Sequence, residues 1–177
     1  MAAAFLLCAL VAPSASEAQA AHVAVIEHDG SSYDRFAGGV PNLAARGTAA
    51  RKFFETHGDH YDFLIVLPLF PFDLGAEGAA GLHTMVRSDV LGIGVPPFDS
   101  GAPFGSASRL KGYVDLTALS GGANPDLDAT LVTLSHEVEH QWAAHISYRD
   151  PLTGQDRSDL LGREGSHWSF FLDTDGS

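Results

Sequence analysis

The stretch from Asn124 to Trp142 constrains the fold most, because it carries the strongest helix signal in the chain. Asn124 is a favourable N-cap residue, Pro125 suits the first helical position, and acidic residues follow in the first turn. Apolar residues then recur every three or four positions in a stripe about 80° wide. The stripe consists of Leu127, Leu131, Leu134, Val138 and Trp142. We therefore predict an amphipathic helix that lies against another layer of structure.

The same helix contains the sequence His-Glu-Val-Glu-His at positions 136–140, an H-E-x-x-H pattern. Two His residues at this spacing project from one face of a helix, so both imidazoles can reach one Zn²⁺ at about 2.0–2.1 Å. At about 100° per residue, His136 and His140 face away from the apolar stripe. Glu137 is expected on their flank, where it can accept a proton from a metal-bound water.

A zinc site needs a third protein ligand besides these two His residues. On a continuous helix, His145 would point back along the apolar stripe, which argues against it. The remaining candidates are His167, Glu164 and Asp159. His167 ranks first because a His on a return loop is a good zinc ligand, and the other two stay open.

The chain before this helix alternates between strand and helix signals. Residues 22–27 form a short β-rich run, residues 42–56 have loosely helical spacing closed by Gly58, and residues 62–68 form an apolar run typical of a strand covered on both faces. Together these segments predict a βαβ unit. Further short strands are predicted at residues 82–86, 90–95 and 111–116.

Residues 1–20 have the pattern of a secretory signal peptide. An apolar run at residues 2–13 is followed by Ala-Gln-Ala at 18–20, a cleavage signature, although no Lys or Arg precedes the run. The run is too short to span a bilayer, which takes about 20 residues. We expect cleavage after Ala20, a mature domain at residues 21–177, and a secreted or extracytoplasmic location without a membrane span. The alternative is a buried hydrophobic first helix.

The charge balance narrows the classes of partner. The 177 residues include 10 Lys and Arg against 22 Asp and Glu, a formal net charge of -12. Binding to nucleic acid or to an anionic membrane surface depends on clustered Lys and Arg. The composition therefore argues against both kinds of partner.

Two segments resemble a group of largely uncharacterised secreted bacterial proteins, the zincin-type (HExxH) zinc metallopeptidase-like family. They are His-Glu-Val-Glu-His-Gln-Trp at 136–142 and Leu-Gly-Arg-Glu-Gly-Ser-His-Trp-Ser-Phe-Phe-Leu-Asp at 161–173, and shorter likenesses lie at 61–66 and 87–94. The metzincin variant of the pattern is absent, since Ala143 replaces its Gly and Ile146 its third His. The short stretch after His167 leaves open a longer natural chain.

The resemblance implies an α+β, zincin-like fold: a mixed β-sheet with the N-terminal βαβ unit packed on a central HExxH helix. It also implies a metalloendopeptidase-like hydrolase that uses Zn²⁺, with a protein or peptide as substrate. The resemblance does not identify the third ligand. From the argument on spacing and residue type, we expect His136, His140 and, ranked first, His167 to hold the metal, with Glu137 as the general base and no other cofactor. Tyr113 and Tyr148 are candidate donors to the oxyanion. The alternative function is a non-catalytic extracellular binding or adhesion module that keeps the fold.

Overall fold

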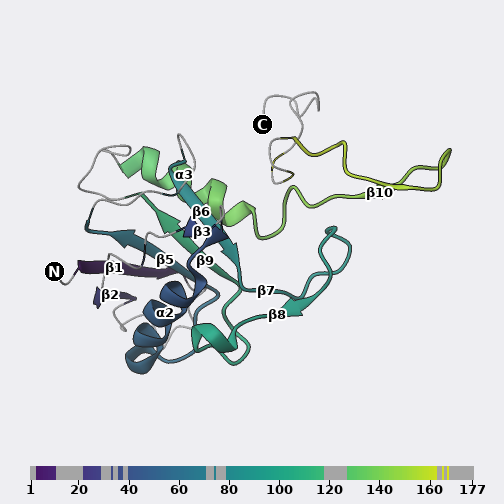
Figure 1. Cartoon of the computed structure of the whole chain (residues 1–177). Coiled ribbons are helices and arrows are strands. Elements are labelled where there is room, and N and C mark those ends of the chain that lie inside the picture. Colours follow the sequence, from purple (N-terminus) through teal and green to yellow (C-terminus); the bar gives the residue numbers. More distant parts are fainter. Residues whose placement is uncertain are drawn as a thin grey trace.

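A computed structural model describes residues 3–10, 22–28, 33, 36–37, 40–70, 74, 79–117, 127–162, 165 and 167. The fold is α+β and is built on a mixed five-stranded sheet in the order β2-β1-β5-β9-β6 (Figure 1). Its strands are β1 (Ala3–Leu10), β2 (Val23–His28), β5 (Phe63–Pro68), β6 (Gly81–Met85) and β9 (Gly112–Leu116). β5 and β9 are parallel, and the other neighbouring strands are antiparallel. The expected α+β class with a mixed sheet is confirmed.

The helices α2 (Leu43–His57) and α3 (Leu127–Glu139) lie on opposite faces of this sheet (Figure 1). Successive side chains of a strand point to opposite faces, so β5 contributes to two apolar clusters. Leu64 and Val66 pack in the cluster with α2, whereas Phe63 and Ile65 pack in the cluster with α3. The continuous apolar run of β5 therefore reflects a strand covered on both faces, as predicted.

The predicted βαβ unit is present, but a strand separates its two β-strands. The side chain of Asn42 accepts a hydrogen bond from the Ala45 N–H at 3.2 Å and begins α2, and Gly58 ends it with a φ of 68°. β2 and β5 are each antiparallel to β1, so they run in the same direction with β1 between them. The order of elements was predictable, whereas the inserted strand was not.

β1 comes from the segment that the sequence assigns to a leader. Its backbone pairs with β2 along residues 3–8 and with β5 along residues 5–10. Cleavage after Ala20 would remove this strand from inside the sheet; the expected cleavage site itself lies outside the described residues. In the part of the chain that the structure describes, no helix has the length and apolar character needed to cross a bilayer.

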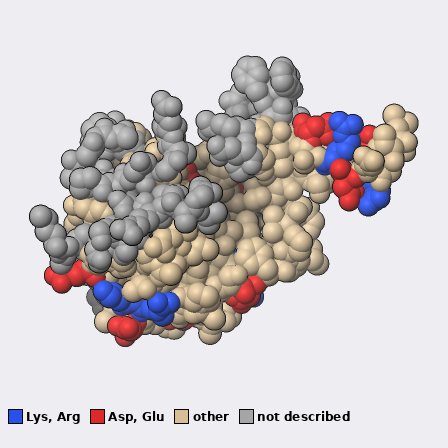
Figure 2. Space-filling model, viewed as in Figure 1, with Lys and Arg blue, Asp and Glu red and all other residues tan. Residues whose placement is uncertain are grey.

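The remaining elements are short. They are β3 (Phe36–Ala37), β4 (Val40–Pro41), β7 (Arg87–Ser88), β8 (Phe98–Asp99), η1 (Ala102–Phe104), β10 (Tyr148–Arg149) and β11 (Asp156–Arg157). β10 and β11 form a hairpin that projects from the body, and Figure 2 shows charged side chains of both signs gathered on it.

Two of the three further predicted strands form, and one does not. Residues 82–86 and 111–116 correspond closely to β6 and β9, but residues 90–95 form a bent loop. Gly92 and Gly94 adopt positive φ angles of 85° and 92° there, which interrupts an extended strand. The prediction of a strand at 90–95 is therefore wrong.

The helix α3 is rotated from the orientation that its apolar stripe suggests. Leu134 and Val138 pack on the sheet, but Leu127 and Leu131 remain 70% and 48% exposed. The one buried residue of α3 is polar, Glu137 at 7% exposure, and Gln141 shortly after the helix is also polar, at 2%. Positions 134, 137, 138 and 141 form the row that faces the sheet. The predicted cap at Asn124 and Pro125 lies outside the described residues.

Candidate metal centre

Two of the predicted ligands lie at the C-terminal end of α3. His136 is in the last turn of the helix, and His140 follows directly after Glu139, where the helix ends. Their ring centroids are 4.9 Å apart with the ring planes at 85°. The i, i+4 spacing therefore places both imidazoles together at this end of the helix.

A short return loop brings His167 to the same place. Its backbone carbonyl accepts a hydrogen bond from the Gly162 N–H at 2.7 Å, which closes the loop. The His167 ring stacks on His136 at 5.4 Å and meets His140 edge-on at 5.0 Å. One ligand atom from each of the three His residues lies within 4.8 Å of the others. Among the described residues this is the one group of three or more such side chains that could hold a metal ion.

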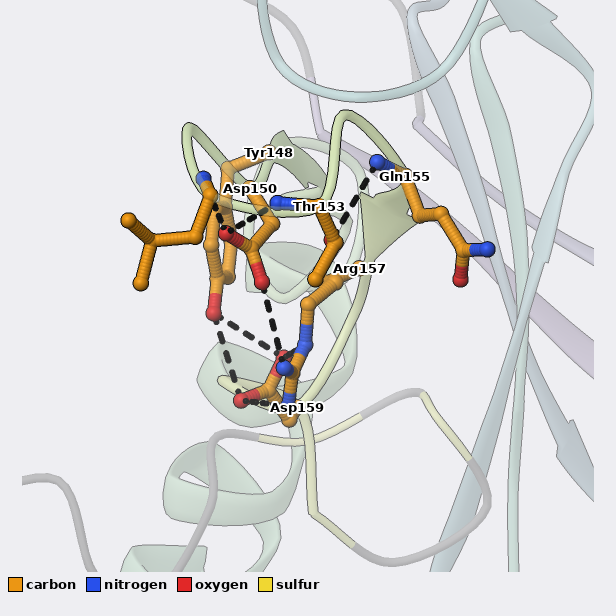
Figure 3. A network of polar contacts seen from close by, with 7 residues as sticks. Tyr148, Asp150, Thr153, Gln155, Arg157 and Asp159 are labelled. Carbon is orange, nitrogen blue, oxygen red and sulfur yellow. Dashed lines mark hydrogen bonds and ion pairs between the residues drawn. The ribbon is translucent and has the colours of Figure 1, made fainter.

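The other two candidates for a third ligand fare differently. Figure 3 shows Asp159 in a polar network on the projecting hairpin, where Arg157 donates to its two oxygens at 2.9 and 3.0 Å. The Tyr148 hydroxyl donates to the same carboxylate at 3.1 Å. A hydrogen bond from the backbone N–H of Asp159 itself lowers the pKa of this carboxyl group, and the hydrogen bond from Arg157 lowers it further. Asp159 is thus a structural partner of the hairpin, and Glu164 lies outside the described residues.

The chemistry of the three His residues suits a divalent metal. Tetrahedral coordination with Zn–N bonds of 2.0–2.1 Å separates ligand nitrogens by about 3.4 Å, within reach of small side-chain rotations here. Burial, followed by the neighbouring His136 and His167, lowers the pKa of His140 to about 4. His140 therefore stays neutral over the physiological range, which is the state that binds a metal.

Glu137 occupies a more enclosed position than the sequence suggests. It points toward the sheet, where it is 7% exposed and packs against the edge strand β6. Burial raises the pKa of its carboxyl group from 4.5 to about 7, and a hydrogen bond from the backbone N–H of His83 opposes this rise. Among the described residues, no Lys or Arg forms an ion pair with Glu137.

Sequence reasoning missed the polar side chains beneath the site. Burial, and then His140, lower the pKa of His83 in β6 to about 4. Its Nε2 and the Oε1 of Gln141 are both buried with no hydrogen-bond partner in the described structure, while Gln141 Nε2 donates to the Arg87 carbonyl at 2.7 Å. The sequence indicates that residues 81, 83 and 85 share one face of a strand. It does not indicate which helix covers that face.

His145 lies close to the site without joining the group of ligand atoms. After α3 the chain turns at Ala144, which has a φ of 60°. The helix therefore ends before His145, whereas the expected position of His145 depended on a continuous helix. The Nε2 of His145 lies 2.7 Å from the backbone carbonyl of His140. The backbone of the loop at Gly94 packs directly against His145 and Ile146, which holds this turn in place.

The two tyrosines considered as oxyanion donors are engaged elsewhere. Tyr113 is fully buried on the α2 face of the sheet and shares a hydrogen bond of 2.7 Å with the Tyr33 hydroxyl. Tyr148 belongs to the projecting hairpin (Figure 3). The assignment to Tyr113 is therefore wrong, because this residue lies on the face of the sheet opposite α3, whereas the assignment to Tyr148 stays a prediction.

The comparisons with known proteins add no family to this picture. No protein-family model, no curated protein and no solved structure matches the chain. The class that can be stated from the fold and the site is an α+β protein with a three-His group able to hold a metal ion.

Proposed function

We propose that the chain is a zinc-dependent hydrolase that cleaves peptide bonds, with a zincin-like arrangement of sheet and HExxH helix. The observation that carries the proposal is the meeting of His136 and His140 with His167, whose ligand atoms lie within 4.8 Å of one another. Catalytic zinc sites have three protein ligands and keep the fourth position open for water or substrate. Three His residues and no fourth protein ligand among the described residues support a catalytic site over a closed structural one.

Zn²⁺ bound here would polarise the scissile carbonyl and lower the pKa of a water ligand. The chain would hold the ion with the imidazoles of His136, His140 and His167, and Glu137 directly follows His136 on the same helix. Glu137 accepts the proton of the attacking water and passes it to the leaving amine. In the chain without a metal ion, burial raises the pKa of the Glu137 carboxyl group to about 7. A general base works best when its pKa lies near the operating pH.

The peptide substrate and the extracellular setting rest on the sequence. The resemblance of residues 136–142 and 161–173 to secreted zinc metallopeptidases supports a peptide or protein substrate. The apolar run at residues 2–13 and Ala-Gln-Ala at 18–20 support export, with a mature chain that begins at Ala21. N-terminal sequencing of exported protein tests this last point, and an intact Met1 would contradict it.

The test of the proposed function uses the full chain loaded with one equivalent of zinc. We expect it to cleave unfolded casein, to stop on chelation, and to recover when zinc is restored. Glu137→Gln should lower turnover by about 10²–10⁴-fold, the usual contribution of positioned general acid–base catalysis, while zinc content is retained. The matched control is Glu139→Gln, which alters an exposed Glu two positions along the same helix and should keep most of the activity.

Two outcomes would overturn the assignment. Near-normal turnover in Glu137→Gln would show that another group is the base. A zinc-loaded wild type that hydrolyses no member of a broad peptide library would favour the non-catalytic binding or adhesion module instead.

A further inference from the structure

The contact between Glu137 and the edge strand β6 depends on a glycine. A Cβ atom at position 81 would lie 2.5 Å from Cγ of Glu137 and 2.8 Å from its Cδ and Oε1. Real Cβ atoms do not approach other heavy atoms so closely. Any other residue at position 81 would therefore displace the carboxyl group of Glu137 or move the strand away from α3.

The backbone conformation does not explain this glycine. Gly81 is not among the residues with a positive φ, and it lies in a regular ladder opposite Leu116 of β9. An alanine could adopt such a conformation, and glycine inside a strand is normally a disadvantage of roughly 0.5–1 kcal/mol. Position 81 requires a glycine because the side chain of Glu137 occupies the space that a Cβ atom would fill.

A second part of β6 holds the same carboxyl group. The backbone N–H of His83, two residues along the strand, donates a hydrogen bond to Glu137. The His83 ring turns aside against Gly112 and Phe63, and a Cβ at position 112 would lie 2.6 Å from its Nε2. Two neighbouring strands thus each carry a glycine beneath a polar side chain on the α3 face.

We propose that Gly81 and the backbone N–H of His83 are the positioning groups of Glu137, and that the edge strand β6 sets where its carboxyl group lies. Without the space at Gly81, the Glu137 side chain adopts another rotamer and leaves the His83 N–H. The placement itself is a property of the fold. Its catalytic consequence rests on the proposed hydrolase function, because only there does Glu137 move a proton.

The experiment is a double-mutant cycle on thermal stability in the full chain. Gly81→Ala in the wild-type background should lower the Tm by about 2–12 °C, the range for overpacking in a chain of this size. In a Glu137→Ala background, the space is vacant, so Gly81→Ala should leave the Tm unchanged or raise it. A Glu139→Ala background is the control, and there the full loss should persist. The double variant keeps the test decisive even if Gly81→Ala alone fails to fold.

A kinetic measurement separates this inference from the proposed function. In an active protein, Gly81→Ala should lower kcat by at least about tenfold with KM within about twofold, since positioning of a base acts on the chemical step. Zinc content should stay at the wild-type level. An equal Tm loss with and without Glu137, or an unchanged kcat in an active protein, would overturn the positioning role. If the Tm loss of Gly81→Ala depends on Glu137 but the protein has no turnover, the positioning role stands and only the proposed function is contradicted.

Discussion

The two faces of the sheet bury charged groups in opposite ways. On the α2 face, Arg46 and Asp115 are both 0% exposed, and the Arg46 Nε donates to Asp115 at 2.6 Å. The other oxygen of Asp115 accepts a hydrogen bond from the Tyr33 hydroxyl. Burial raises the pKa of Asp115, and the guanidinium of Arg46 opposes that rise. Both carboxylate oxygens are thus engaged by donors from other parts of the chain.

On the α3 face, the buried carboxyl group has no cation beside it among the described residues. Glu137 receives one backbone hydrogen bond from His83, and its pKa rises to about 7. The neighbouring His83 and Gln141 each keep a buried polar atom without a partner in the described structure. A buried polar group is costly unless it is paired, so such groups concentrate where they serve chemistry.

Under the proposed function, the difference separates a structural use of a buried carboxyl group from a chemical one. The ion pair joins α2 to β9, and the Arg46 guanidinium favours the charged form of Asp115. Incomplete pairing leaves Glu137 able to change its charge near neutral pH. We therefore expect substitutions on the α2 face to act on stability, and substitutions on the α3 face to act on metal binding and turnover.

The largest expected effect is on the stability of the α2 face. Arg46→Met leaves Asp115 buried without its guanidinium, and removal of one partner of a buried pair costs about 3–5 kcal/mol. Chemical unfolding measured by circular dichroism checks this value. The matched control is Arg149→Met, which removes an exposed pair with Asp156 whose side chains are 69% exposed and should cost at most about 1 kcal/mol. Similar losses in both variants would contradict the comparison.

The next largest effect concerns the metal. His140→Ala and His167→Ala should each weaken zinc binding by at least about 100-fold, because a catalytic zinc site needs all three protein ligands. Competition with a chromophoric chelator gives the affinities. Asp159→Asn should bind zinc like the wild type, since Asp159 is engaged by Arg157 and Tyr148. Wild-type affinity in His167→Ala would show that the third ligand lies elsewhere.

The smallest effect is a pH dependence on the α3 face. The pKa of Glu137 rises from 4.5 to about 7 on folding, so within this range the folded chain keeps a proton that the unfolded chain has lost. Glu137 therefore lowers stability as the pH rises through that window. His83 and His140, with pKa values lowered from 6.5 to about 4, raise stability with pH between those values.

Glu137→Gln removes only the first of these opposing contributions. Relative to the wild type, the metal-free variant should gain about 1–2 kcal/mol of unfolding free energy between pH 4.5 and 7, after allowance for solvent screening. Urea titrations of both proteins at several pH values measure the difference. A difference that stays constant across this range would show that the carboxyl group titrates normally in the folded chain.

Local sequence determined the elements and the His pair. The helical spacing at 42–56, the glycine at position 58 and the apolar run at 62–68 predicted α2 and β5, because turns and periodic patterns depend on neighbouring residues. The spacing of His136 and His140 likewise follows from helix geometry alone. His167 was ranked first among three candidates from its residue type and loop context.

Only the tertiary structure decided how these parts meet. The rotation of α3 that buries Glu137, the strand β1 between β2 and β5, and the separation of Asp159 from the three His residues depend on contacts between distant segments. Position 81 shows the reason most clearly. The sequence contains a glycine at position 81, but the reason for it is visible only in the fold. There Glu137, more than fifty residues later in the chain, packs over this glycine. Local patterns specify helices and strands, whereas the packing of one element on another specifies which side chains become chemical groups of a site.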